Sequence, residues 1–389
     1  MHKEIIAKQK KAMAQSGLDA IISVSPENFA YVAGFVVPSQ PLIRHRHAMV
    51  ITTADGRAEL FGVDMEASTI GRNEPDTPTT IWAEFSDDPM LVLAGQLRDM
   101  GLESARIGIE MDYLPAGDFN RLQADLPKAC FEPAEHILAR LRQIKTPREI
   151  ELLRRLSRIA DQSITDALAQ VDAGDSEMDI AGMLTRNVYS LGAEHFKLLI
   201  VATGDRSVLP NVGPSDRVLK HRDVCRVEIF SVINGYQAGV CRTAVVGEAP
   251  EHAERIWAHL VECKYEIMDK VKPGASCREI YDSFIAKLAK LDLPPISFVG
   301  HGIGLHLHED PYLGLTPEIG KPGGDAEIEE GMVLGFEPLC YDTGYGFGMQ
   351  NKDMLLVTDK GSELLSDYAD TDRLIVCGTA RDGRKTAVA

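Results

Sequence analysis

The sequence predicts an α+β protein of two domains, with a smaller amino-terminal α/β domain over residues 1–145 and a larger domain over residues 146–380. At 389 residues the chain is longer than one hydrophobic core usually requires, so two domains are expected. The boundary lies at Thr146-Pro147-Arg148-Glu149, which combines a helix N-cap, a proline at the first helical position and a glutamate at the third. A long helix is therefore expected to open the second domain.

The first domain is expected to alternate helices and strands. Charged and apolar residues recur at helical spacing over residues 3–16, and this pattern stops at Gly17. Residues 18–24 read as a buried strand, and a loop is expected over residues 25–28. The remaining expected elements are a hairpin of residues 48–53 and 57–62, a helix over 89–100, a strand over 105–110 and a helix over 118–126.

The second domain is expected to pair helices with an antiparallel sheet. Its first helix should reach about residue 171, and Ser176 with Asp179 predicts the start of another that runs to Gly192. Ser276 and Glu279 form a further capping box. The other expected elements are helices over residues 249–271 and 276–291 and strands over residues 299–308, 331–338 and 353–358.

The composition is that of an ordinary globular protein, with 44% hydrophobic and 25% charged residues. The net charge of −17 argues against nucleic acid as a partner, because phosphate backbones bind basic surfaces. The amino-terminal segment lacks an apolar secretory core, and the longest apolar runs are too short to span a membrane. Seven cysteines without a Cys-x-x-Cys pair predict reduced thiols and a cytoplasmic location. The expected partner is a small-molecule substrate.

The most informative segment reads Gly-His-Gly-Ile-Gly-Leu-His-Leu-His-Glu-Asp-Pro over residues 300–311. Its three histidines and two acids are set among glycines, which let the backbone approach a ligand closely. Buried imidazoles need partners or lose their charge, so such a run is costly to keep for packing alone. The segment predicts an active or binding site, and the alternative is a polar turn with incidental histidines.

This segment resembles the His-Gly-Ile-Gly-Leu…His-Glu-x-Pro signature of the pita-bread family, which includes methionine and Xaa-Pro aminopeptidases, prolidases and creatinase. The likeness extends over residues 202–217, 235–243, 332–338 and 353–358, and with the amino-terminal domain it covers nearly the whole chain. The resemblance implies a pita-bread catalytic domain preceded by a smaller α/β domain.

The resemblance also implies positions for a metal site. Family peptidases hold two divalent ions with two aspartates, one histidine and two glutamates, and the matching positions here are Glu228, Gly239, His301, Glu337 and Lys352. Gly239 offers no side chain, and Lys352 brings a positive charge where hard divalent ions need anionic oxygen. The sequence therefore indicates a degraded two-metal site, and we expect no metal or other cofactor.

Lys352 is expected to take over the role of the lost positive charge. Two buried glutamates without a counter-charge are disfavoured by repulsion and by desolvation. An ammonium between Glu228 and Glu337 would offset that cost. The alternative is that Lys352 points to solvent from a strand edge.

Five residues are candidates for substrate binding. His308 matches the family histidine that contacts the substrate carbonyl, although it could instead support the site. Asn211 and Cys241 stand where creatinase has a catalytic histidine and a glutamate, and Cys241 could be a nucleophile or a core filler. Arg44 and Arg46 lie where creatinase places a carboxylate-binding arginine, unless they are solvated loop charges. In a family dimer that loop reaches the neighbouring cleft, so a homodimer is expected.

Taken together, these residues predict a metal-independent, creatinase-like hydrolase that cleaves a C–N bond in a small nitrogenous carboxylate. His301 would move protons, Glu228 or Glu337 would align water, and Lys352 would supply fixed positive charge. One alternative is an Xaa-Pro peptidase that retains a single metal ion on the two glutamates and His301. Another is a non-catalytic small-molecule-binding protein that kept the pocket.

Overall fold

The computed structural model describes residues 3–315 and 326–378. Over this range the chain forms two compact units, one that ends at Arg142 and one that begins at Gln143. No helix in these described residues is long and apolar enough to cross a membrane.

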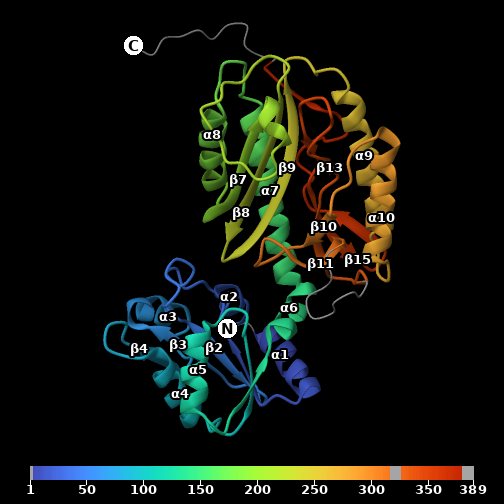
Figure 1. Ribbon diagram of the computed structural model, residues 1–389. Helices are drawn as coiled ribbons and strands as arrows, with labels where there is room; N and C mark the ends of the chain where they lie inside the picture. Colours follow the sequence, from blue (N-terminus) through green and yellow to red (C-terminus); the bar gives the residue numbers. More distant parts are fainter. Residues whose placement is uncertain (1–2, 316–325, 379–389) are drawn as a thin grey trace, which may run out of the picture. The chain divides into compact units, whose positions relative to one another are not determined.

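The first unit is built on a mixed sheet, of which Figure 1 labels β2, β3 and β4. The sheet has six strands in the order β4-β3-β2-β1-β5-β6. Helices flank this sheet, and one core holds β-branched and aromatic side chains from its central strands, including Ile22, Ile51 and Phe61. The strands are β1 (Ala20–Ser23), β2 (Met49–Thr53), β3 (Ala58–Val63), β4 (Thr79–Trp82), β5 (Arg106–Ile109) and β6 (Cys130–Pro133). The helices are α1 (Lys3–Ser16), α2 (Pro26–Ala33), α3 (Ala67–Asn73), α4 (Pro89–Asp99), α5 (Ala116–Asp125) and α6 (Glu135–Gln143).

The expectation of a loop at residues 25–28 is wrong, because α2 begins there. Ser25 is the N-cap, with its side chain accepting a hydrogen bond from the Asn28 amide at 3.1 Å, and Pro26 occupies the first turn. A serine followed by proline and glutamate is a helix-start pattern, because proline fits the first turn, where no amide donor is needed. The expected hairpin is confirmed, since β2 and β3 pair in antiparallel fashion.

The second unit opens with two helices on a long antiparallel sheet. The helices are α7 (Pro147–Leu168) and α8 (Glu177–Ser190), and the sheet is formed by β7 (His195–Thr203), β8 (Val224–Ile233), β9 (Tyr236–Val246) and β17 (Ile375–Cys377). Both helices pack against this sheet and begin with the predicted capping boxes at Thr146 and Ser176.

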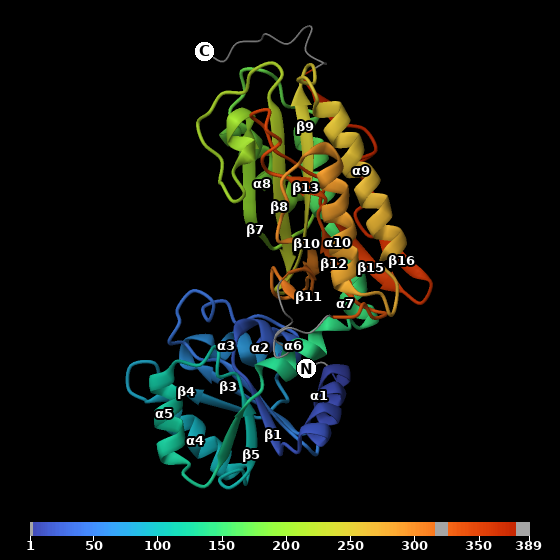
Figure 2. The same cartoon turned by 45° about the vertical axis from the view of Figure 1, so that its right-hand side comes forward.

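The other half of the second unit holds the helices α9 (Ala253–Lys270) and α10 (Cys277–Leu288), which run side by side along its outer face (Figure 2). They cover a five-stranded sheet formed by β10 (Phe298–Gly302), β11 (Glu309–Gly314), β12 (Val333–Phe336), β15 (Asp353–Thr358) and β16 (Gly361–Leu364). Two short strands, β13 (Leu339–Cys340) and β14 (Met349–Gln350), form a separate ladder. A backbone bridge between Cys241 and Lys352 joins β9 to the start of β15.

The strand expected over residues 299–308 is shorter than predicted. β10 ends at Gly302, and the chain re-enters the sheet as β11 at Glu309. Gly302 allows this close turn, because a Cβ at that position would lie 2.3 Å from the Asp310 carbonyl oxygen. The predicted strand at residues 353–358 is confirmed.

Candidate active site

Four charged or titratable side chains meet between the two sheets of the second unit. Glu228 lies in the middle of β8, His301 is in β10, Glu337 follows β12 directly, and Lys352 precedes β15. All four are nearly or fully buried. We call Glu228, His301, Glu337 and Lys352 the site cluster.

Lys352 lies between the two carboxylates. Its Nζ is 3.1 Å from Glu228 Oε1 and 3.5 Å from Glu337 Oε2, and it lies 4.7 Å from the centre of the Phe230 ring. Burial opposes the charge on Lys352, but the two carboxylates outweigh it and raise the lysine pKa. Burial also raises the pKa of Glu337, and the Lys352 ammonium opposes that rise. The side chain of Lys352 is 2% exposed, so the solvent-facing alternative does not apply.

His301 presents a bare nitrogen to the site cluster. Its Nδ1 lies 2.8 Å from the Gly302 carbonyl oxygen, so Nδ1 carries the proton and donates it. Its buried Nε2 has no hydrogen-bond partner among the described residues and lies 3.6 Å from Glu337 Oε1. Burial, together with the Lys352 charge, lowers the pKa of His301 well below its usual value. The imidazole is therefore neutral near pH 7, and Nε2 holds an available lone pair.

An aromatic wall borders His301. The ring of His308 stacks on that of His301 with a centroid distance of 3.8 Å and an angle of 15°. Phe298 and Tyr312 contact both imidazoles. Desolvation and the Lys352 charge lower the pKa of His308 to about 4, although the residue as a whole is exposed. His308 is thus a second neutral imidazole that can donate or accept a hydrogen bond at the edge of the site.

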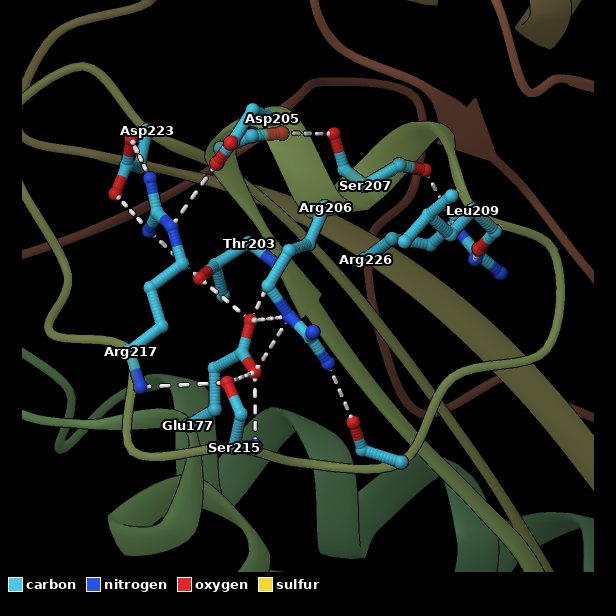
Figure 3. Close-up of polar contacts among 12 residues, drawn as sticks. Glu177, Thr203, Asp205, Arg206, Ser207, Leu209, Ser215, Arg217, Asp223 and Arg226 are labelled. Carbon is cyan, nitrogen blue, oxygen red and sulfur yellow. Dashed lines mark hydrogen bonds and ion pairs between the residues drawn. The ribbon is translucent and has the colours of Figure 1, made fainter.

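Arg226 and Gln350 connect the site cluster to a loop. Gln350 Nε2 donates to Glu337 Oε2 at 2.6 Å, and Arg226 Nη1 donates to Gln350 Oε1 at 3.0 Å. Arg226 also donates to the carbonyl oxygens of Leu209 and Pro210. Figure 3 shows Arg226 beside Leu209. This Arg226–Gln350–Glu337 relay was not predicted. An arginine in the middle of the apolar strand β8 is the signal that could have revealed it, because a buried guanidinium needs several acceptors.

The same loop is anchored on its other side by Glu177. The Glu177 carboxylate is fully buried at the start of α8. It accepts hydrogen bonds from Thr203, Arg206 and Ser215 (Figure 3). A few residues further on, Arg217 forms a close ion pair with Asp223, with 2.6 Å between Nη1 and Oδ2. These contacts hold the segment from Thr203 to Arg217 against α8 and β8.

The other candidate substrate-binding residues lie in different surroundings. Asn211 is exposed on the loop held by Arg226. Cys241 lies opposite Glu228 across β8 and β9, and it is fully buried. Burial raises the pKa of its thiol, and the nearby Glu228 charge adds to that rise. A thiol with a raised pKa is a poor nucleophile near neutral pH, which favours the core-filler interpretation.

Arg44 and Arg46 belong to the first unit. Arg44 is exposed. The Arg46 guanidinium grips Glu84 with both Nε and Nη2, at 2.8 and 2.9 Å. The guanidinium donors of Arg46 are thus bound to a carboxylate of the first unit.

The residues present do not fit a pair of metal ions. Gly239 lies opposite Phe230 in the β8–β9 pair, and a Cβ at position 239 would stand 2.4 Å from the phenyl ring. The space for a second acidic ligand is therefore filled. Within residues 3–315 and 326–378, no three His, Cys, Asp or Glu side chains are arranged to hold a metal ion. The Lys352 ammonium occupies the position between the remaining carboxylates.

Two family models together match most of the chain. Residues 151–359 match metallopeptidase family M24, and residues 6–144 match the creatinase/prolidase N-terminal domain. Because the first match covers more than half of the chain, the protein belongs to metallopeptidase family M24. Members of this class are hydrolases that act on C–N bonds.

Individual relatives agree over nearly the full length. An Xaa-Pro dipeptidase of Pyrococcus furiosus is 26% identical, and the match covers 94% of this chain and 98% of that protein. An Xaa-Pro dipeptidase of Pyrococcus horikoshii is 25% identical over 93% of this chain and 97% of that protein. Among solved structures, an Xaa-Pro dipeptidase from Bacillus anthracis superposes with a TM-score of 0.82 at 24% identity, covering 96% of this chain and 99% of that one.

These comparisons confirm the predicted two-domain pita-bread fold. They also show that the expected metal-independent, creatinase-like hydrolase is wrong, because the relatives are named Xaa-Pro dipeptidases and their family is one of metallopeptidases. The error has a physical origin. Gly239 and Lys352 set how charge is balanced in the site, but charge balance alone does not determine which bond is cleaved.

Proposed function

We propose that this protein is a peptidase of the Xaa-Pro dipeptidase type, which cleaves the bond between a residue and a following proline in a dipeptide. The observation that carries the proposal is the match to Xaa-Pro dipeptidases over 93–94% of the chain, through both domains. The family match over residues 151–359 includes all four residues of the site cluster. The closed arrangement around His301 and Glu337 supports it, because amide hydrolysis needs a sheltered polar site.

The residues of the site cluster can share the work of amide hydrolysis. Cleavage requires a group that takes a proton from water and a donor or positive charge that faces the developing oxyanion. We assign the first role to the Nε2 lone pair of His301, which takes the proton from water and then returns it to the departing proline nitrogen. Glu337 lies beside it and orients the water. We assign the second role to Lys352 and to the N–H of His308. The exposed loop at Asn211 would contact the substrate.

The proposal is tested with a dipeptide that has proline in second position and with its reversed isomer as the control. Release of free proline is measured from the metal-stripped protein and after addition of manganese. We expect cleavage of the first dipeptide only, and we expect the variant His301→Gln to lose it. Absence of cleavage in every condition, or equal cleavage of the reversed isomer, would contradict the proposal.

A further inference from the structure

The site cluster has the composition of a cation site that is filled by part of the protein itself. Two buried carboxylates and one neutral imidazole surround a single ammonium, and the nearest polar atoms are 3.1 to 3.6 Å apart. Carboxylate oxygen and imidazole nitrogen are the ligands that manganese, zinc and cobalt ions prefer. The formal charge of the four groups is −1, since two carboxylates face one ammonium and His301 is neutral.

The bare nitrogen of His301 is an independent sign of a cation site. A fully buried ring nitrogen without a hydrogen-bond partner is costly, because it loses the water it would bind in the unfolded chain. The Nδ1–H bond to Gly302 fixes the ring so that Nε2 faces Glu337. An imidazole held in this tautomer by a backbone carbonyl is arranged as a ligand for a positive ion.

The cluster has room for one such ion at most. Position 239, which faces the site from β9, can carry no side chain because the Phe230 ring occupies that space. Among the side chains that the structure describes, the place left is the one between Glu228 and Glu337, where the ammonium of Lys352 now lies.

We propose that the Lys352 ammonium and a single divalent cation compete for one place between Glu228, Glu337 and His301. The protein then binds one ion at most, and binds it weakly, because the ion must displace an ammonium tethered to the neighbouring backbone. Displacement separates a buried charge from its partners, which is strongly unfavourable. Among the described residues these three side chains do not form a metal site while the ammonium lies between the carboxylates. A neutral residue at position 352 frees them to close on one ion and to bind it tightly.

Manganese binding tests this competition without any substrate. The metal-stripped protein is titrated with manganese(II), and free ion is followed by electron paramagnetic resonance. We expect weak binding by the wild type and one tightly bound ion per chain in Lys352→Gln, with affinity higher by at least about 100-fold. Lys352→Met serves as a second variant, in case the new amide itself contributes to binding.

Two control variants locate the ion. Lys145→Gln removes another buried lysine, whose Nζ lies 3.0 Å from Glu309, and it should leave manganese binding unchanged. The double variant Lys352→Gln/His301→Ala should lose the affinity that Lys352→Gln gained.

Two results would overturn the proposal. The first is tight binding of one or two manganese ions by the wild-type protein. The second is manganese binding that stays unchanged in both Lys352 variants when both are folded. Because ion binding is measured in the absence of peptide, this proposal and the proposed peptidase activity can fail separately.

Discussion

Two buried clusters of charge lie on opposite sides of the same strands, and only in one of these two do the positive and negative charges balance. The site cluster contains two carboxylates, one ammonium and an imidazole with a bare nitrogen. The second, which we call the anchor cluster, consists of Asp161, Arg242, Lys264 and Asp353. In it, Arg242 pairs with Asp161 and Asp353 at 2.8 Å each, and Lys264 pairs with Asp353 at 2.7 Å. Two positive charges therefore balance two negative ones at short range.

The separation of the two clusters follows from the alternation of side chains along a strand. Cys241 faces the site while its neighbour Arg242 faces α7, and Lys352 faces the site while its neighbour Asp353 faces the anchor cluster. Arg242 also donates to the carbonyl oxygen of Lys352 at 2.7 Å. The anchor cluster thus fixes the backbone from which the ammonium extends. We infer that the anchor cluster, whose charges balance, supplies stability and that the site cluster supplies chemistry.

The largest effect expected from this comparison is the loss of stability in Arg242→Met. The change leaves two buried carboxylates without their guanidinium, and breaking a buried charge pair costs about 3–5 kcal/mol. Urea unfolding of the variant and the wild type measures the difference. Arg242→Lys should recover only part of it, because one ammonium cannot replace the two-pronged contact. A loss below about 1 kcal/mol would mean that the anchor cluster is not the stabilising one.

The opposite pattern is expected for His301→Gln in the site cluster. Its Nε2 makes no hydrogen bond to any residue in the described part of the chain, so the free energy of unfolding should fall by only about 1 kcal/mol, for the lost Nδ1 bond. Turnover of the proline dipeptide should fall by about 10²–10⁴-fold if His301 is the proton acceptor. Unfolding curves and initial rates are measured on the same preparation. A stability loss as large as that of Arg242→Met would remove the distinction between the clusters.

Gln350→Leu should have an intermediate effect on both properties. The variant breaks the relay and leaves Glu337 and Arg226 each without one hydrogen bond, at a cost of about 1–3 kcal/mol in stability. The reaction rate should fall about tenfold, because Glu337 is no longer held toward His301. The kinetic constants separate two roles of Gln350. A fall in kcat indicates that Gln350 positions Glu337. A rise in KM alone indicates that Gln350 affects only the loop at Leu209, through Arg226.

The sequence predicted more of the fold than of the site. The start of α7 was predictable, because capping depends on residues a few positions apart. The family resemblance and the balance of charges predicted the residues of the site cluster, which are Glu228, His301, Glu337 and Lys352. The relay through Gln350 was not predictable, since Arg226 and Gln350 are 124 residues apart and meet only when the sheets pack. The function was predicted wrongly, because the balance of charge at positions 239 and 352 does not say which bond is cleaved, whereas the relatives are named Xaa-Pro dipeptidases.

The smallest effect expected concerns His47 in the first unit. Like His301 it is a buried histidine, but its Nε2 has a carboxylate as a hydrogen-bond partner. Its Nε2 lies 2.9 Å from Asp118 Oδ2, yet burial outweighs that carboxylate and lowers the pKa of His47 below 6.5. Just below pH 6.5 the unfolded chain therefore binds more protons at His47 than the folded chain does. The contribution of the neutral His47 to the free energy of unfolding is complete above this pH range, and it is lost as the pH falls through the range. Unfolding free energies measured from about pH 8 to pH 5 should show a shallower decline in His47→Gln than in the wild type. An unchanged slope would place the acid sensitivity elsewhere, with the neutral imidazoles of the site cluster as the next groups to examine.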